Sequence, residues 1–471
     1  MLSALCFLLS SRIRHHKELL ITRETISLAP PVERAVLVGA PIKGKRARLE
    51  LAEHLEELAE LADTAGAVIV GEVTQALDKP NPATYLGKGK LEELRDAADR
   101  DEATLIIFDD ELSPAQARNV EQAIGVRVMD RAELILDIFA TRARTSEARM
   151  QVELAQLRYM LPRLTRMWTH LEKFRGGIGM RGPGETQLET DRRLISHRIR
   201  VLDERLSGVQ KARAVQRQSR DSFFRAALVG YTNAGKSSIL RALAQANDVF
   251  VEDRLFATLD PLTREVELGD GQSVLVTDTV GFIRKLPHHL VASFRATLEE
   301  VGEADLLLHV IDIAHVGWEE RAQVVEQVLA DLEVGDVPIL HVFNKIDQLE
   351  HGELIALEDR VQRAMPNSVF VSTLLPDGLE PLRRALVTAR RQLRPTTVLR
   401  LPLGDGKLLA ELHRNGEVIS QHAEGNEWVI TARLDPATLG RLRNSQASIA
   451  GDHASPAASD AAVNSDGQAL P

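Results

Sequence analysis

Short apolar runs alternate with helical patterns over residues 32–140. Four runs rich in β-branched side chains predict strands at residues 35–38, 67–70, 105–108 and 126–129. The segments between them have the spacing of amphipathic helices, at residues 51–62, 90–98 and 114–123. Because parallel strands need crossover helices, this alternation predicts an N-terminal α/β domain with a parallel sheet.

The pattern changes to heptads over residues 141–220. Two stripes of large apolar side chains follow a 4,3 spacing: the first comprises Met150, Leu154, Leu157, Leu161, Leu164, Trp168 and Leu171, and the second Leu188, Ile195, Ile199, Leu202, Leu206 and Val209. Two such stripes predict an antiparallel helical hairpin with an apolar seam. Pro162 should kink or end the first helix nearby.

The segment between the stripes, residues 175–185, contains five glycines and two arginines. A connection between two helices needs only a few residues, so an ordinary loop explains this segment poorly. Bare glycine backbone can approach RNA where larger side chains would collide. We therefore predict a flexible, basic tip on the hairpin.

Residues 221–393 return to an α/β pattern, with strand-like runs at residues 224–229, 273–277 and 339–343. Residues 394–444 contain shorter alternating runs and predict a small α+β domain. Residues 1–31 are expected to be a flexible extension. From residue 445 to 471, Ala, Ser, Asp and Gly dominate, which predicts disorder. The expected fold is therefore multidomain α/β.

The composition indicates the cellular compartment in which the protein works. A hydrophobic content of 44% with 27% charged residues is that of a globular protein. The single cysteine, Cys6, excludes intramolecular disulfides and a cysteine-cluster zinc site and fits a reducing cytoplasm. The apolar run at residues 1–10 is too short to span a bilayer, and its basic residues follow it instead of preceding it. We expect a cytoplasmic monomer without integral membrane association.

Charge is unevenly distributed along the chain. Residues 141–220 contain 18 Lys and Arg against 8 Asp and Glu, a net charge of +10, whereas the whole chain has −10. A basic block in an acidic protein indicates a polyanionic partner, because neutralising phosphates drives such association. A solvated helix face is the alternative, but it explains the one-sided sign less well, and we favour a nucleic-acid partner.

A phosphate-binding motif lies in the α/β region at residues 230–237, GYTNAGKS. It follows a strand-like run and opens a helical pattern, which is the context that G-x-x-x-x-G-K-[ST] requires. Backbone N–H groups of such a loop surround phosphate oxygens, aided by the helix N-terminus. Lys236 would reach the β- and γ-phosphates, and Ser237 would bind Mg²⁺. The remaining predicted nucleotide contacts here are Gly230, Tyr231, Asn233, Ala234, Gly235 and Ser238.

Two later segments would complete the catalytic end of this site. Asp278 ends a strand and can hold the Mg²⁺ shell, while the N–H of Gly281 can sense the γ-phosphate. A hydroxyl must also come from residues 253–264, where we choose Thr258, with Thr263 second, and expect Phe256 beside the nucleotide. The predicted metal ligands are thus Ser237, Thr258 and Asp278, and the predicted catalytic residues are Lys236, Thr258 and Gly281.

A further motif, residues 344–347 with sequence NKID, follows another strand. Asp347 there can accept hydrogen bonds from guanine N1–H and the 2-amino group, a donor pair that adenine lacks. Asn344 and Lys345 would support it, and Ser372 and Thr373 would close the base pocket. Several such motifs at the carboxyl ends of strands predict GTP as the nucleotide.

These motifs together resemble the HflX-type GTPases, a ribosome-associated branch of the translation-factor class of P-loop GTPases. The resemblance covers residues 32–434 and is carried by residues 81–90, NPATYLGKGK, by residues 151–157, QVELAQL, and by residues 181–189, RGPGETQLE, besides residues 230–237, 256–260, 278–282 and 344–347. Two departures stand out. Ser238 replaces the usual threonine, and Thr373-Leu374 replace the customary alanine-lysine.

The resemblance implies a factor that binds the large ribosomal subunit and its rRNA, with the glycine-rich arm reaching toward the peptidyl-transferase region. It implies GTP-dependent splitting of stalled or idle ribosomes. It also leaves a secondary ATPase activity of the N-terminal domain open. Two other classes remain as alternatives: an assembly or RNA-modification GTPase acting on free rRNA, and a signalling GTPase with a protein or membrane partner.

Two residues bear on the rate of hydrolysis. Phe282 occupies the place where many GTPases have a water-orienting glutamine, so we expect intrinsic turnover on the order of 10⁻³ s⁻¹ or below and stimulation by ribosomes. Asn233 stands where some related GTPases use asparagine to help hold K⁺ beside the phosphates. An asparagine that only braces the loop is the equal alternative.

Overall fold

The computed structural model describes residues 32–44, 47–167, 183–217, 223–245, 254–269, 272–286, 301–332, 334, 337–392, 396–434 and 448–449. The predicted extension at residues 1–31 and the tip from residue 175 to 182 lie outside the described residues. So do Trp168 and Leu171 of the first predicted stripe.

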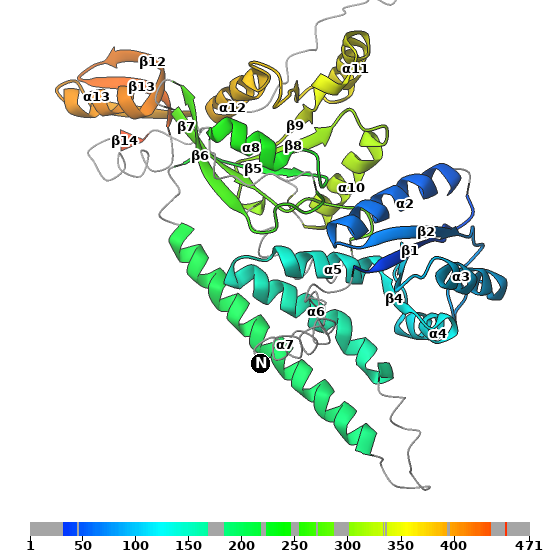
Figure 1. The fold of residues 1–471 in the computed structure, drawn as a ribbon. Helices are drawn as coiled ribbons and strands as arrows, with labels where there is room; N and C mark the ends of the chain where they lie inside the picture. Colours follow the sequence, from blue (N-terminus) through cyan, green and yellow to red (C-terminus); the bar gives the residue numbers. More distant parts are fainter. Residues whose placement is uncertain are drawn as a thin grey trace, which may run out of the picture.

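The N-terminal part is a four-stranded parallel sheet of order β2-β1-β3-β4 (Figure 1). Its strands are β1 (Arg34–Gly39), β2 (Val68–Thr74), β3 (Leu105–Phe108) and β4 (Arg127–Asp130). Helices α3 (Lys88–Arg100) and α4 (Pro114–Ile124) cover one face, and α2 (Ala47–Thr64) and α5 (Arg131–Arg142) the other. The predicted parallel α/β fold is confirmed, whereas α5 was not predicted.

The hairpin consists of α6 (Ser146–Met167) and α7 (Pro183–Arg217), which lie side by side in Figure 1. Leu154, Leu202 and Leu206 are buried together in the seam, and Met150, Leu157 and Ile199 pack against them. Two ion pairs brace the helices: the Arg158 guanidinium lies 2.8 Å from Asp203, and that of Arg198 lies 2.6 Å from Glu153. The predicted apolar seam therefore forms.

Pro162 lies inside the first helix, which continues through it to Met167. The expectation that this proline kinks or ends the helix nearby stays a prediction, because residues 168–182 lie outside the described part of the chain. Pro162 is exposed, so water can satisfy the carbonyl group that loses its backbone donor. At the other side of the tip, residues 183–185 open α7 instead of belonging to the loop. A proline suits that first helical position, since its missing N–H would have no helical partner there.

The third part is a six-stranded sheet of order β10-β9-β8-β5-β7-β6, in which only β6 is antiparallel to its neighbour. Its strands are β5 (Arg225–Gly230), β6 (Leu262–Gly269), β7 (Gln272–Asp278), β8 (Leu306–Asp312), β9 (Ile339–Asn344) and β10 (Ser368–Phe370). Helices α8 (Lys236–Ala244) and α12 (Glu380–Gln392) cover one face, and α10 (Trp318–Asp331) and α11 (His351–Ala364) the other.

A small antiparallel sheet, of order β12-β13-β11-β14, closes the described chain. It contains β11 (Thr396–Pro402), β12 (Gly416–Glu424), β13 (Glu427–Leu434) and β14 (Ser448–Ile449), with helix α13 (Gly406–Asn415). Leu399, Leu401, Leu412 and Ile430 are fully buried in its core. Strand β14 lies within the segment for which the sequence predicts disorder, and pairing with β11 orders these two residues.

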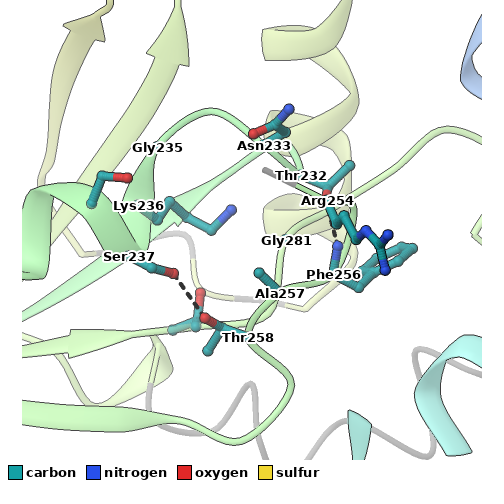
Figure 2. A pocket seen from close by; sticks show the side chains of 12 residues that line it. Thr232, Asn233, Gly235, Lys236, Ser237, Arg254, Phe256, Ala257, Thr258 and Gly281 are labelled. Carbon is teal, nitrogen blue, oxygen red and sulfur yellow. Dashed lines mark hydrogen bonds between the residues drawn. The ribbon is translucent and has the colours of Figure 1, made fainter. Parts of the chain in front are cut away.

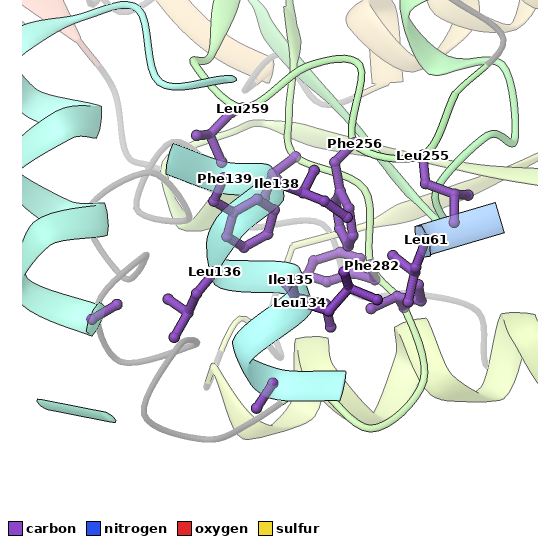
Figure 3. Close-up of a cluster of buried hydrophobic side chains, with 14 of the residues drawn as sticks. Leu61, Leu134, Ile135, Leu136, Ile138, Phe139, Leu255, Phe256, Leu259 and Phe282 are labelled. Carbon is purple, nitrogen blue, oxygen red and sulfur yellow. The ribbon is translucent and has the colours of Figure 1, made fainter. Parts of the chain in front are cut away.

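One hydrophobic core is shared by the N-terminal sheet, α5 and the loops of the six-stranded sheet (Figure 3). Phe139 of α5 meets Phe256 edge to face, with ring centroids 4.7 Å apart. Phe282 is 1% exposed in the same cluster as Leu61 and Ile135. The loops that follow β5 and β7 are therefore held from the N-terminal side. No helix among the described residues has the length and apolar character needed to cross a bilayer.

Candidate nucleotide-binding site

The phosphate-binding motif forms the turn between β5 and α8. Strand β5 ends at Gly230, and α8 begins at Lys236. Gly235 has φ +95°, and a Cβ atom there would lie 2.2 Å from Nδ2 of Asn344. Asn344 uses that same amide to donate to the carbonyl oxygen of Ala234, at 2.9 Å. Only glycine fits this close approach, which joins the phosphate loop to the NKID loop.

Lys236 lies buried behind this turn. Its Nζ donates to the carbonyl oxygens of Gly230, at 3.1 Å, and Tyr231, at 2.8 Å. Burial lowers the pKa of Lys236 to about 8, although the charge of Asp278 opposes this shift. Phosphate oxygens would supply the counter-charge that a buried ammonium lacks.

Three oxygen donors from separate elements meet beside Lys236. The Ser237 hydroxyl lies 2.7 Å from that of Thr258 (Figure 2) and donates to Asp278 at 2.6 Å. Asp278 is buried, and burial raises its pKa against the opposing effect of Lys236 and of hydrogen bonds from Ser237 and Thr258. Within the described residues, its Oδ1 has no hydrogen-bond partner. Two hydroxyls and an unsatisfied carboxylate oxygen are the hard donors that fit Mg²⁺.

The two threonines proposed from the sequence have different surroundings in the structure. Thr258 lies at the Ser237–Asp278 cluster, whereas Thr263 lies in β6 and its hydroxyl pairs with that of Thr277 in β7, at 2.9 Å. The Thr263 hydroxyl is therefore engaged in a hydrogen bond within the sheet.

The backbone of the phosphate loop holds the other two loops in place. Thr232 N–H donates to the Phe282 carbonyl at 2.7 Å, and Phe282 N–H donates to the Gly230 carbonyl at 3.1 Å. Thr232 Oγ1 accepts from the Phe256 N–H at 2.9 Å. A Cβ atom on Gly281 would lie 2.7 Å from the Thr232 Cα and 3.1 Å from Lys236 Nζ. The position thus admits only glycine beside the amine.

A pocket opens at this junction, as Figure 2 shows. It is lined by the predicted residues Asn233, Gly235, Lys236, Ser237, Ser238, Phe256, Thr258 and Gly281, and also by Thr232, Arg254, Ala257 and Thr279. The last four were not predicted. Arg254 is exposed and brings a positive charge to the pocket from the same loop as Thr258. Its only sequence signal is its position four residues before that threonine.

The predicted base-recognition residues gather after β9 and β10. Asp347 accepts a hydrogen bond from the Ser372 hydroxyl, which in turn accepts from the Leu374 N–H at 3.0 Å. Lys345 has φ +67°, and its amine lies 2.8 Å from Asp312. Asn344 is buried, and among the described residues its Oδ1 has no partner. Thr373 follows Ser372 in the same loop.

Tyr231 connects this site to the N-terminal part through its side chain. Its hydroxyl donates to Glu57 of α2 and accepts from the Arg284 N–H at 2.9 Å. Glu57 also accepts from Arg131, which donates to Asp109 at 2.7 Å. The ring of Tyr231 lies under the Arg321 guanidinium, 4.9 Å away. Nothing in the spacing of these residues indicates that they meet, so this buried network was not predicted.

A second contact ties the hairpin to the Thr258 loop. The Asp260 carboxylate accepts from the backbone N–H groups of Arg144, at 3.0 Å, and Thr145, at 3.3 Å, just before α6 begins. The loop that supplies the candidate Mg²⁺ hydroxyl is therefore attached to the base of the hairpin.

Comparison with known proteins agrees with this geometry. Family models described as "GTP-binding GTPase N-terminal", "GTP-binding GTPase Middle Region" and "50S ribosome-binding GTPase" match residues 52–140, 142–220 and 225–345. The GTPase HflX of Magnetococcus marinus is 46% identical over 87% of this chain and 94% of its own. That of Escherichia coli is 46% identical over 77% and 85%.

Among solved structures, a crystal structure described as the SsGBP and GDP complex is 25% identical. It covers 77% of this chain and 99% of its own, with a TM-score of 0.45. The family models and the two HflX relatives together span the N-terminal sheet, the hairpin and the nucleotide site. The chain belongs to the HflX family of GTPases.

Proposed function

We propose that the protein binds GTP with Mg²⁺ and hydrolyses it to GDP and phosphate on the large ribosomal subunit, thereby splitting stalled or idle ribosomes in the cytoplasm. The observation that carries the nucleotide part is a pair of buried acceptors, Asp278 Oδ1 and Asn344 Oδ1, without partners among the described residues. A buried polar atom without a partner costs about 1–3 kcal/mol, which a bound ligand would offset.

Each residue of the site has a role in this proposal. The Lys236 ammonium holds the β- and γ-phosphates, and Ser237, Thr258 and Asp278 hold Mg²⁺. The Gly281 N–H contacts the γ-phosphate. Backbone groups from Gly230 to Ser238, with Phe256 at the rim, surround the phosphates, and Asn233 is the K⁺ candidate. Mg²⁺ would neutralise charge that develops on the phosphates.

Guanine selection falls to the NKID loop and its partner. Asp347 would accept from guanine N1–H and the 2-amino group in exchange for Ser372, which already holds its carboxylate. Asn344 and Lys345 brace this loop against the phosphate loop and β8. The backbone of Ser372 and Thr373 faces the base. Adenine lacks this donor pair, so ATP is a weak substrate of this pocket.

Slow intrinsic hydrolysis follows from the position of Phe282. Its ring is buried in the shared core with Leu61 and Ile135, so it turns away from the place where a water molecule would be oriented. Phenyl carbon offers no hydrogen bond to water in any case. Ribosome docking then has to supply or order the missing group.

The hairpin supports an RNA partner. Part of its positive charge is neutralised internally, because Arg158 and Arg198 pair with acids of the opposite helix. Arg192, Arg193 and Arg205 of α7 remain exposed. These side chains present positive charge suited to rRNA phosphates. The family description "50S ribosome-binding GTPase" for residues 225–345 points to the same partner.

The test is GTP turnover and ribosome sedimentation with purified subunits. Wild type is compared with a deletion of residues 176–184, and Lys236→Ala is the control that lacks nucleotide binding with the arm intact. We expect large subunits to raise turnover of wild type but not of the deletion, and GTP-loaded wild type to convert whole ribosomes into subunits. Equal turnover with and without large subunits contradicts the proposal. Binding to free rRNA precursors alone would indicate the assembly-factor alternative.

A further inference from the structure

Two histidines face each other behind the nucleotide site. His309 of β8 and His341 of β9 are direct partners in the parallel ladder, so both side chains leave the same face of the sheet. Their ring centroids are 5.6 Å apart. This face is the one that α10 covers, because neighbouring side chains such as Leu307 pack with Val325 and Leu329 of that helix.

The burial of the ring nitrogens at this place is unusual for polar groups. His309 is 0% exposed, and within the described part of the chain neither of its ring nitrogens makes a hydrogen bond. The Nδ1 atom of His341 is buried and unpartnered in the same way. Three buried nitrogens without partners lie next to each other. Each such group left unsatisfied costs about 1–3 kcal/mol.

A carboxylate completes the group from the helix above. Glu326 of α10 places an oxygen so that one donor atom from each of Glu326, His309 and His341 lies within 4.8 Å of the others. Glu326 is exposed, so its side chain can adjust without disturbing the core. Zinc with bonds of about 2.0–2.2 Å needs its donors about 3.3–3.5 Å apart, so the carboxylate and the two imidazole rings have to move closer together when the ion binds.

The protonation state also suits a metal. Burial lowers the pKa of His309 to about 3, with the charges of His341 and Lys236 acting in the same direction. Burial lowers the pKa of His341 as well, although a hydrogen bond with the Asn367 backbone and the charge of Glu326 oppose it. Both rings are therefore neutral at physiological pH, which is the form that binds metals. A backbone partner on the second histidine is typical of metal-bound imidazole.

We propose that His309, His341 and Glu326 form a site for a late first-row divalent cation, with Zn²⁺ as its preferred occupant. Two imidazoles and one carboxylate are a known zinc donor set, with a fourth position left for solvent on the side of Glu326. Imidazole discriminates against Mg²⁺, so this site is chemically distinct from the one at Ser237, Thr258 and Asp278. The ion joins β8, β9 and α10 on the sheet face behind the phosphate loop.

The test uses untagged full-length protein saturated with GDP and Mg²⁺, titrated with Zn²⁺ against a chromophoric chelator. We expect one tight Zn²⁺ per chain. His341→Gln should weaken it by at least about 100-fold, more than the 10–100-fold typical of losing an outer-shell partner, and Glu326→Gln by about tenfold. Glu326 is exposed, so its variant keeps the test sound should the His341 variant fold poorly.

Matched controls address other histidines. His351→Gln changes an exposed histidine of α11, and a double variant of His288 and His289 removes an adjacent pair in the sequence. Both should bind Zn²⁺ as wild type does. Co²⁺ should give the visible absorption of a four-coordinate nitrogen–oxygen site in wild type and lose it in His341→Gln. Equal Zn²⁺ affinity in wild type and His341→Gln, or loss of the tight site in the His288 and His289 variant, overturns the proposal.

Discussion

The two parallel sheets of this protein place acidic residues at their carboxyl ends, yet they treat them in opposite ways. At the end of β4, Asp130 accepts hydrogen bonds from Tyr159, Glu133, Leu112 and Arg163. At the end of β7, one oxygen of Asp278 has no partner among the described residues. The first sheet uses its polar edge to hold the protein together. The second leaves its edge incomplete for a ligand.

The same contrast holds for buried cations. Arg131 is buried between Glu57 and Asp109, and Asp109 also binds Lys285 at 2.5 Å. Burial by itself would raise the pKa of Asp109, but the charges of Arg131 and Lys285 hold it below its usual value. Lys236, by comparison, donates to carbonyl oxygens alone among the described residues. A sheet edge therefore becomes a binding site where the chain leaves its charges unpaired.

The largest effect on stability should come from a substitution in the fully paired polar cluster at the edge of the N-terminal sheet. Arg131→Met leaves Glu57 and Asp109 buried without their shared cation, and removing one partner of a buried pair costs about 3–5 kcal/mol. We expect a lower urea midpoint and melting temperature. The double variant Arg131→Met with Glu57→Gln should recover part of the loss. An unchanged melting temperature in Arg131→Met would mean that the cluster contributes nothing to stability.

A substitution at the incompletely paired edge of the six-stranded sheet should reduce ligand binding and leave stability almost unchanged. Lys236→Ala removes the charged partner of the phosphates and should weaken GDP binding by about 100-fold or more, given about 1.5–3 kcal/mol for each charged hydrogen bond. Stability of the nucleotide-free protein should change little, because the variant removes the desolvation cost of the buried ammonium together with its attraction to Asp278. Fluorescent GDP titration and thermal melting measure the two quantities. A large fall in melting temperature without nucleotide would contradict the contrast.

The pH dependence of binding should sharpen the same point. With its pKa lowered to about 8, Lys236 loses its proton above that pH in the free protein, whereas the phosphates favour the protonated form. GDP affinity should thus be constant below pH 7 and fall by up to about tenfold per unit above pH 8. Titration calorimetry in buffers of different ionisation enthalpy should show proton uptake on binding. Absence of uptake at pH 8.5 would show that Lys236 is already fully protonated.

The smallest effect concerns the bond between the two sheets. Tyr231→Phe removes the hydroxyl that joins Glu57 to the Arg284 N–H. We expect a loss of about 1–2 kcal/mol in unfolding free energy and faster hydrogen exchange at residues 281–286. Equal exchange in wild type and Tyr231→Phe would mean that this bond does not couple the two parts.

The sequence was sufficient where a local pattern reports a local structure. The strand at residues 105–108 and the apolar seam of the hairpin both came from spacing. The choice of Thr258 over Thr263 as a metal ligand stays a prediction. Helix α5 could not be predicted in this way. Its residues Leu134, Ile135, Leu136, Ile138 and Phe139 are all buried and form a nearly continuous apolar run, which periodicity alone cannot distinguish from a buried strand. It is covered on one side by the sheet and on the other by Phe256 and its neighbours.

The long-range polar contacts were equally invisible in the sequence. Glu57 and Arg131 are 74 positions apart, and each has the appearance of an ordinary helix-surface residue. His309 and His341 lie within apolar strands, where a single polar residue gives no sign of its partner. Such contacts depend on the register between strands that are distant in the sequence, and residue spacing does not encode this register.

The attachment at Asp260 has a mechanical consequence. Helix α6 has 22 residues, so at 1.5 Å per residue it is about 33 Å long. A tilt of about 5° at the Arg144–Thr145 joint would displace its far end by about 3 Å, roughly the rise of two helical residues. Asp260 lies two positions after Thr258. A rearrangement of about 1 Å at the candidate metal site would therefore reach the far end of the hairpin as a movement comparable to the size of a base contact.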